Sequence, residues 1–228
     1  MTAKKDTPKD HASPPCLAAE IDPTYFDPLA VDPQQAEDVA RWRKSERVRL
    51  LAERAAMSIA YRHDASEVIA DHIDRLLIAR FGPLKGLKIS AWWPIKAELN
   101  LRNYLTDLVA RGVTVALPVV LTPGTPLVFR PWTPDCHMIQ GFWKIPVPAE
   151  GPEVRPDIAL SPLVGWDGAG YRLGYGGGYF DRTLASLSPR AFAIGVGLDA
   201  ARVATIFPQP HDIAMDVIVT ESGVQPKG

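Results

Sequence analysis

The chain has 228 residues, of which 46% are hydrophobic, and this is enough apolar material for a substantial core. Its formal net charge of −1 gives no reason to expect nucleic acid or an acidic membrane as a partner. The apolar runs are too short for a membrane span or a secretory signal, and Cys16 and Cys136 lie far apart outside any CxxC motif, so we expect a protein of the reducing cytoplasm.

The first part of the chain divides into an extension and two helices. Residues 1–33 are rich in proline, charge and small side chains, and we expect a flexible extension there. We expect a single domain over residues 34–228. Helix formers run from about residue 32 to residue 60, and a second helical pattern follows over residues 65–80, before a Gly-Pro pair.

The first helix combines an apolar face with a group of arginines, which lie about 100° away around the helix. The apolar face is expected at Val48, Leu51, Ala55 and Ile59, and the arginine group at Arg43, Arg47 and Arg54. Arg43 and Arg47 are four positions apart, so with Lys44 their charges could converge on one triphosphate. The alternative is an ordinary solvated basic stripe.

Strands and helices alternate after the second helix. Helices are expected over residues 101–110 and 180–187, and strands over residues 87–93, 113–117, 127–132, 158–164, 191–196 and 217–220. The strand at 127–132 lies in a proline-rich region and is expected in a hairpin or at an edge. Continuous apolar strands that alternate with helices predict a mainly parallel sheet covered on both faces. Ligands of such sheets lie at the carboxyl ends of the strands.

A glycine-rich run, YRLGYGGGYFD, follows the strand at 158–164 and is expected to begin directly where that strand ends. Glycines allow several backbone N–H groups to approach one anion, and the helix that follows adds its positive end. Arg172 supplies a positive fork for phosphate and Asp181 a hard oxygen ligand for a divalent cation. The run lacks the endings of a Walker loop and of a dinucleotide loop. The alternative is a flexible turn between a strand and a helix.

Three other segments carry side chains suited to a flat heterocyclic ligand and a cation. Trp92 and Trp93 end a strand, and Glu98 follows them; one tryptophan could stack on a ring whose N–H groups bind the carboxylate. The other must enter the core, because adjacent strand residues face opposite ways. Trp143 lies in a loop stiffened by prolines, where it is either a lid or a buried anchor. Asp212 could join Asp181 on a cation.

Five segments in this order, RKSER, PIKAEL, FWKIPVP, RLGYGGGYFDR and PHDIAMD, resemble the 5-formyltetrahydrofolate cyclo-ligase family. The resemblance runs from about Arg41 to Glu221. It implies a three-layer α/β/α sandwich with a mainly parallel sheet, related to the sugar-phosphate isomerase and CoA-transferase group. It also implies a ligase of one-carbon metabolism that uses ATP and Mg²⁺ to cyclise 5-formyltetrahydrofolate to 5,10-methenyltetrahydrofolate, with release of ADP and phosphate.

Carried over by position, the resemblance implies a role for each site residue. The nucleotide would be held by Arg43, Lys44, Arg47, Arg172, Leu173, Gly174, Tyr175, Gly176, Gly177, Gly178, Tyr179 and Phe180. The folate would contact Trp93, Glu98, Trp143 and Tyr179. Magnesium would bind Asp181 and Asp212, and Arg172 and Tyr179 would take part in catalysis. We expect a monomer that acts on a small molecule and binds neither nucleic acid nor membrane.

The sequence departs from the family pattern in the lid loop. Many bacterial members have glycine where this chain has Lys144, and glutamate where it has Val147. Two other readings therefore stay open: a paralogous ATP-dependent ligase acting on another heterocycle, and a non-catalytic protein that binds folate or nucleotide.

Overall fold

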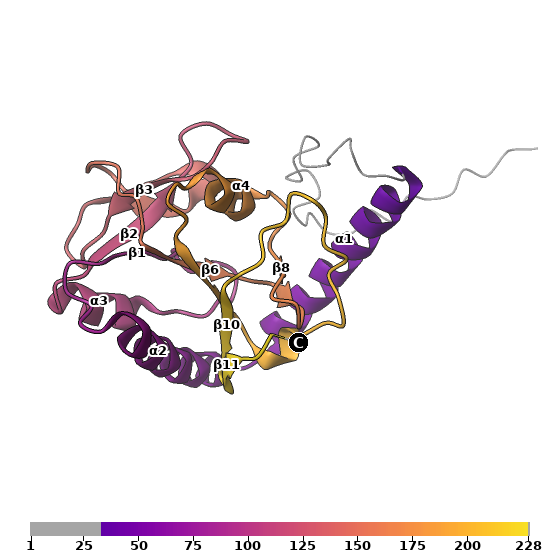
Figure 1. Cartoon of the computed structure of the whole chain (residues 1–228), viewed down its shortest axis with the longest axis horizontal. Helices are drawn as coiled ribbons and strands as arrows, with labels where there is room; N and C mark the ends of the chain where they lie inside the picture. The colour runs from indigo at the N-terminus through magenta and orange to yellow at the C-terminus, as the bar shows by residue number, and fades with distance from the viewer. Residues whose placement is uncertain (1–32, 228) are drawn as a thin grey trace, which may run out of the picture.

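The computed structural model describes residues 33–227, and it contains a seven-stranded sheet in the order β11-β10-β9-β6-β1-β2-β3 (Figure 1). The five inner strands pair in parallel, and the edge strands β3 and β11 are antiparallel. The strands are β1 (Lys88–Ser90), β2 (Thr114–Val119), β3 (Val128–Pro131), β6 (Ile158–Pro162), β9 (Phe192–Val196), β10 (Val217–Thr220) and β11 (Gly223–Gln225). The mainly parallel sheet predicted from the sequence is confirmed.

Helices cover both faces of this sheet, which gives three layers. Helices α2 (Ile59–Phe81) and α3 (Arg102–Ala110) lie along one face, and α4 (Tyr179–Ser186) lies on the other (Figure 1). The larger core cluster joins α2 and α3 to the sheet through residues such as Ile73 and Leu108, which are fully buried. A second cluster packs Leu184 of α4 against the opposite face. The expected three-layer α/β/α sandwich is therefore correct.

Helix α1 (Pro33–Ala56) does not pack with the apolar face that the sequence suggested. Val48 is 49% exposed, and Ile59, which belongs to α2, is 80% exposed. The inward side of α1 instead carries Val39, Arg43, Leu50 and Arg54, each no more than 8% exposed. The inward side contains arginines because α1 packs on loops that offer them carbonyls and carboxylates, and not on the apolar sheet.

The division between the first two helices also differs from the prediction. Helix α1 ends at Ala56, and the Ser58 side chain caps α2 by accepting a hydrogen bond from Tyr61 N–H at 3.0 Å. The second helix therefore begins six residues before the expected residue 65. Gly82, with φ of 73°, ends it where predicted.

Short strands that the sequence analysis missed surround the site. Strand β7 (Gly165–Trp166) and a turn separate β6 from the glycine run, and Arg172–Leu173 of the run pairs with β7 as β8, so the expected direct connection is wrong. A second hairpin, β4 (Met138–Gln140) with β5 (Pro146–Pro148), carries the predicted lid between its strands.

The predicted extension at residues 1–33 lies, except for Pro33, outside the described residues. Within residues 33–227, no helix combines the length and the apolar character needed to cross a membrane.

Candidate active site

A cavity of about 550 Å³ opens at the carboxyl ends of the parallel strands, between α1, the glycine run and the lid. It begins where β1, β2 and β6 end, as expected for a sheet of this kind. Its lining includes most of the residues singled out from the sequence: Arg43, Arg47, Trp93, Glu98, Trp143, Arg172, Gly174, Tyr175, Gly176, Gly177, Gly178, Tyr179, Phe180, Asp181 and Asp212. Lys44 is exposed and is not part of this lining, and Leu173 is buried beneath it.

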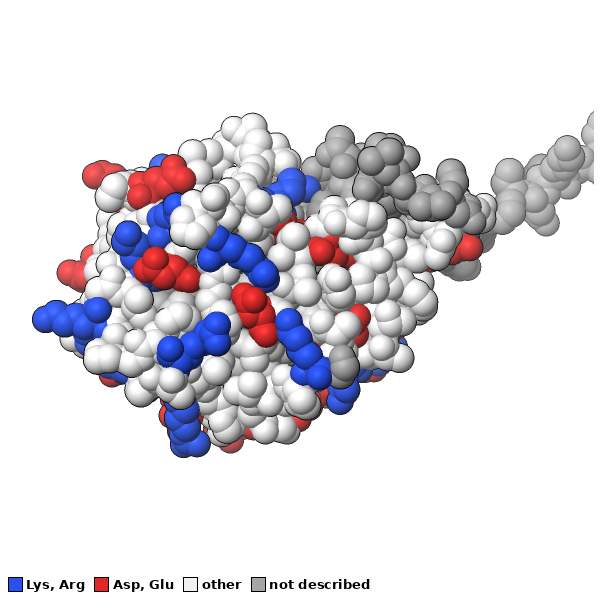
Figure 2. Space-filling model, viewed as in Figure 1, with Lys and Arg blue, Asp and Glu red and all other residues white. Residues whose placement is uncertain are grey.

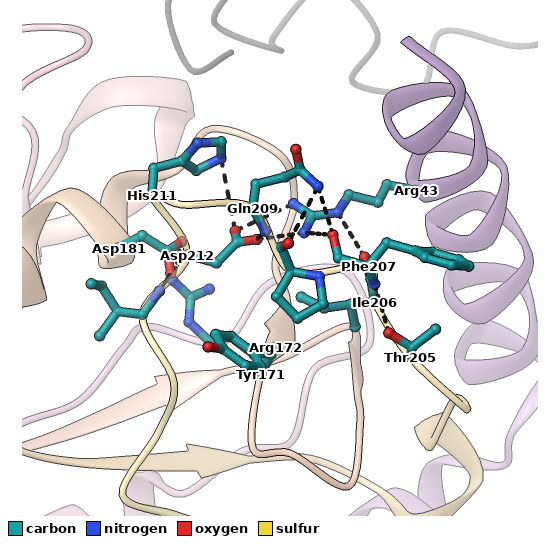
Figure 3. Close-up of polar contacts among 12 residues, drawn as sticks. Arg43, Tyr171, Arg172, Asp181, Thr205, Ile206, Phe207, Gln209, His211 and Asp212 are labelled. Carbon is teal, nitrogen blue, oxygen red and sulfur yellow. Dashed lines mark hydrogen bonds and ion pairs between the residues drawn. The ribbon is translucent and has the colours of Figure 1, made fainter. Parts of the chain in front are cut away.

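Arg43 and Arg47 reach from α1 toward the cavity. The Arg43 guanidinium donates to the backbone carbonyls of Ile206 and Phe207, each at 2.9 Å, and forms a close ion pair with Asp212 (Figure 3). Arg47 Nε donates to the Gly174 carbonyl at 2.7 Å. These arginines therefore do not form a solvated basic stripe, because both donate hydrogen bonds to loops that pack against α1.

The glycine run is closed by an ion pair between its two ends. Arg172 Nη2 donates to Asp181 Oδ2 at 2.7 Å, and both residues are buried. A Cβ at Gly174 would lie 2.7 Å from Arg172 Nη1, so a side chain there would displace the guanidinium. Gly178, with φ of 63°, turns the chain into α4, whose first turn carries Asp181.

Two observations decide whether these residues suit a phosphorylated ligand and its cation. Arg172 Nε is buried without a hydrogen-bond acceptor among the described residues, so the guanidinium has capacity to spare. The structure places no group of three or more possible metal ligands within residues 33–227. Magnesium commonly uses one or two carboxylates together with phosphate oxygens, and Asp181 and Asp212 line the same cavity. The donor set therefore fits a cation that arrives with a phosphorylated ligand.

The other end of the cavity is built from aromatic and acidic residues. Trp92 is 7% exposed, and Trp93 is half-buried at the cavity wall, so one tryptophan of the pair does enter the core. Glu98 is buried and accepts a hydrogen bond from Ile95 N–H at 2.8 Å. Burial raises the pKa of Glu98 to about 7, against the hydrogen bond from Ile95 and the positive charge of Arg54, which lower it.

The lid is an exposed aromatic loop in a constrained backbone. Trp143 is 41% exposed, and its ring meets the Tyr179 ring edge-on, with 5.2 Å between centroids. Trp143 and Lys144 have φ of 54° and 60°, in the left-handed region that favours glycine. The exposure of Trp143 argues against a buried anchor.

Sequence reasoning missed a second arginine contact. Arg54, also on α1, donates to the Tyr175 hydroxyl at 2.5 Å. Arg43, Arg47 and Arg54 share the inward side of a helix, and that spacing was visible in the sequence. What they face could not be seen, because Tyr175 lies 121 positions away.

The fold and the cavity define a class: an α/β protein whose ligand crevice, lined by a glycine-rich loop, opens at the carboxyl edge of a parallel sheet. Residues 39–221 match the model of the 5-formyltetrahydrofolate cyclo-ligase family. The match covers most of the chain, and the protein belongs to this enzyme family.

Relatives of known function and structure agree with this assignment. The 5-formyltetrahydrofolate cyclo-ligase of Haemophilus influenzae is 29% identical over 175 residues, which cover 73% of this chain and 91% of that protein. The enzyme of the same name from Mycolicibacterium smegmatis is 34% identical over 153 residues, covering 61% of this chain and 78% of the relative. The solved structure of Aquifex aeolicus 5,10-methenyltetrahydrofolate synthetase superposes with a TM-score of 0.68 at 28% identity and covers 81% of this chain and 92% of that one.

Proposed function

We propose that this protein is an ATP-dependent ligase that cyclises 5-formyltetrahydrofolate to 5,10-methenyltetrahydrofolate and releases ADP and phosphate. The observation that carries the proposal is that one cavity joins the closed Arg172–Asp181 loop to Trp93 and Glu98. One side of that cavity suits a phosphorylated ligand, and the other suits a flat heterocycle with N–H groups.

The chemistry requires alignment and charge neutralisation. The formyl group on N5 is an amide, whose oxygen is a poor leaving group. Transfer of the terminal phosphoryl group of ATP to that oxygen activates the carbon, the neighbouring secondary amine attacks it and loses its proton, and phosphate leaves. A reaction of this kind needs positioned cations and donors but no covalent nucleophile from the protein.

We assign the phosphate end of the cavity to the arginines and the glycine run. Arg43, Arg47 and Arg172 supply positive charge, and the backbone from Leu173 to Phe180 wraps the nucleotide. Lys44 is left out of this set because it is exposed and away from the cavity. Arg172 and Tyr179 stand where the two ligands would meet, and we propose them as the catalytic residues.

We assign the heterocycle end to Trp93, Glu98, Trp143 and Tyr179. Glu98 would accept hydrogen bonds from ring N–H groups, and the aromatic side chains would cover the ring faces. Asp181 and Asp212 would hold magnesium, which when bound supplies neutralisation of the phosphate charge. We also propose that the enzyme is a cytoplasmic monomer with residues 34–228 as one domain.

The test mixes purified protein with MgATP and 5-formyltetrahydrofolate and follows the near-ultraviolet absorbance of the methenyl product together with ADP. Product and ADP in equal amounts, both abolished by EDTA and restored by excess Mg²⁺, support the proposal. Binding of folate without ADP formation would indicate a non-catalytic binding protein. Folded protein that forms ADP only with a different heterocycle would indicate a paralogous ligase.

A further inference from the structure

Arg54 is a buried cation beside the cavity that the proposed phosphate set does not use. It is 8% exposed and lies on α1, two turns beyond Arg47. Its Nη2 donates to the Tyr175 hydroxyl at 2.5 Å and to the Lys96 carbonyl at 3.3 Å. A buried guanidinium is costly unless its partners are well placed, so these contacts define its role.

The two acceptors belong to different loops. Tyr175 is part of the glycine run, and Lys96 is part of the loop between β1 and α3 that carries Glu98. That second loop is bent, since Lys96 and Ala97 have φ of 45° and 63°. A non-glycine backbone in this region persists only where its surroundings hold it. Arg54 therefore links the glycine run to the loop that carries Glu98, the residue proposed to bind the folate ring.

Glu98 is faced by charged or titratable groups from three elements. Arg54 approaches from α1, which also places Glu53 beside a small cavity of about 30 Å³ that Arg54 and Glu98 both line. Lys96 lies on the same loop as Glu98, and Tyr175 lies on the glycine run. The Arg54 charge and the hydrogen bond from Tyr175 both lower the pKa of Glu98, against the burial that raises it.

We propose that Arg54 is a positioning residue that fastens the glycine run to the loop of Glu98, through the Tyr175 hydroxyl and the Lys96 carbonyl, and places its own positive charge beside the Glu98 carboxylate that faces the bound heterocycle. This inference rests on the proposed function, because it takes Glu98 to be the acceptor for the ring N–H groups. Arg54 touches neither reacting group and acts through Tyr175 and Glu98.

The experiment uses the full chain and four variants. Arg54→Met removes the charge and keeps an unbranched stem, Arg54→Lys restores the charge, and Tyr175→Phe removes only a hydroxyl. The matched control is Arg49→Met, because Arg49 lies on the same helix but is half-exposed and, among residues 33–227, pairs only with Glu46 and Glu53. The readouts are kcat/KM for 5-formyltetrahydrofolate from pH 6 to 9 and its affinity by tryptophan fluorescence over the same range.

We expect kcat/KM of the wild type to fall on the acidic side with a midpoint near pH 7, and we expect this acidic limb to lie about one pH unit higher in Arg54→Met. The variant then loses roughly fivefold in kcat/KM at pH 7 and close to tenfold at pH 6, through KM, and recovers by pH 9, since one unit is a factor of ten well below both limbs. Arg54→Lys restores most of the loss, Tyr175→Phe moves the limb in the same direction by less, and Arg49→Met leaves it unchanged.

Two results would overturn the inference: a wild-type pH profile in Arg54→Met, or an equal loss at every pH. If Arg54→Met does not fold, Tyr175→Phe decides, and an unmoved limb there rejects the link. A wild-type enzyme without cyclo-ligase activity would instead reject the proposed function, so the two failures are distinguishable.

Discussion

Arg172 and Asp181 stand nine positions apart in the chain and are joined by a hydrogen-bonded ion pair of 2.7 Å. Between them lie the glycines that line the cavity. The ion pair therefore closes this flexible segment into a ring, and Ile213 N–H holds the second oxygen of Asp181 at 3.2 Å. The two buried charges therefore hold the glycine-rich segment in one loop conformation.

Breaking this pair should reduce both turnover and stability. Asp181→Ala and Arg172→Ala each leave the other side chain buried without its ion-pair partner, which typically costs about 3–5 kcal/mol. We expect turnover to fall at least about a hundredfold, because a positioned charge at the transferring group is lost. Denaturant unfolding and initial rates measure the two effects. The control, Arg190→Met, opens the more exposed Arg190–Asp216 pair and should cost less than about 1 kcal/mol.

The raised pKa of Glu98 predicts how stability varies with pH. Between its ordinary value of 4.5 and the folded value of about 7, the folded state holds the proton more tightly than the unfolded state does. The free energy of unfolding should therefore fall as pH rises through this interval, by at most roughly 3 kcal/mol.

Glu98→Gln, which resembles the protonated side chain, should remove this loss. It should match the wild type near pH 4 and exceed its unfolding free energy at pH 8, while losing folate affinity. Denaturant titrations at both pH values measure the difference. Equal stabilities at pH 8 would contradict the prediction, and the same change at exposed Glu37 should have no such effect.

A methyl group on Gly177 should disturb the aromatic contact beneath the lid. A Cβ there would lie 2.9 Å from the Tyr179 ring and 3.7 Å from the Trp143 ring. We expect Gly177→Ala to move Tyr179 and to lower kcat/KM by about tenfold or more, since small displacements of positioning groups are costly. Among the residues that the structure describes, a Cβ at Gly168 would meet only the end of the Arg202 side chain, at 3.3 Å, so Gly168→Ala should retain wild-type rates.

Lys144 offers a test of backbone strain in the lid. Its φ of 60° costs a side-chain-bearing residue about 1–2 kcal/mol, and glycine avoids this cost. We expect Lys144→Gly to unfold at higher denaturant than Lys144→Ala, with a difference of about 1 kcal/mol, because both lose the charge but only glycine relieves the strain. Identical midpoints for the two variants would show that the lid is unstrained.

The sequence predicted the parallel sheet and its edge strand because apolar runs and glycine or proline breaks record local structure directly. It could not reveal the hairpin at Gly165–Trp166 and Arg172–Leu173, since two residues carry no measurable period. The inward face of α1 was wrong for a different reason. A helix that buries arginines against carbonyls has a mixed inward stripe, here Val39, Arg43, Leu50 and Arg54, which apolar periodicity alone does not identify.

The candidate site was predicted in part by its residues and in part by resemblance. The glycine run indicated an anion site by its chemistry alone, and Arg172 and Asp181 were visible at its two ends. That these two bind each other, and that Arg54 meets Tyr175, depends on long-range packing that no local pattern records.

The ion pairs between arginines and carboxylates inside the cavity also affect how anions approach this protein from a distance. Arg43 and Arg172 each face a carboxylate, so little of their charge extends into bulk solvent. On the surface shown in Figure 2, lysines and arginines alternate with acidic side chains. Long-range attraction accelerates encounters only where a surface presents a field of one sign. A polyanion that approaches this face should therefore meet the molecule at the ordinary diffusional rate, almost independently of ionic strength, and be selected only after contact.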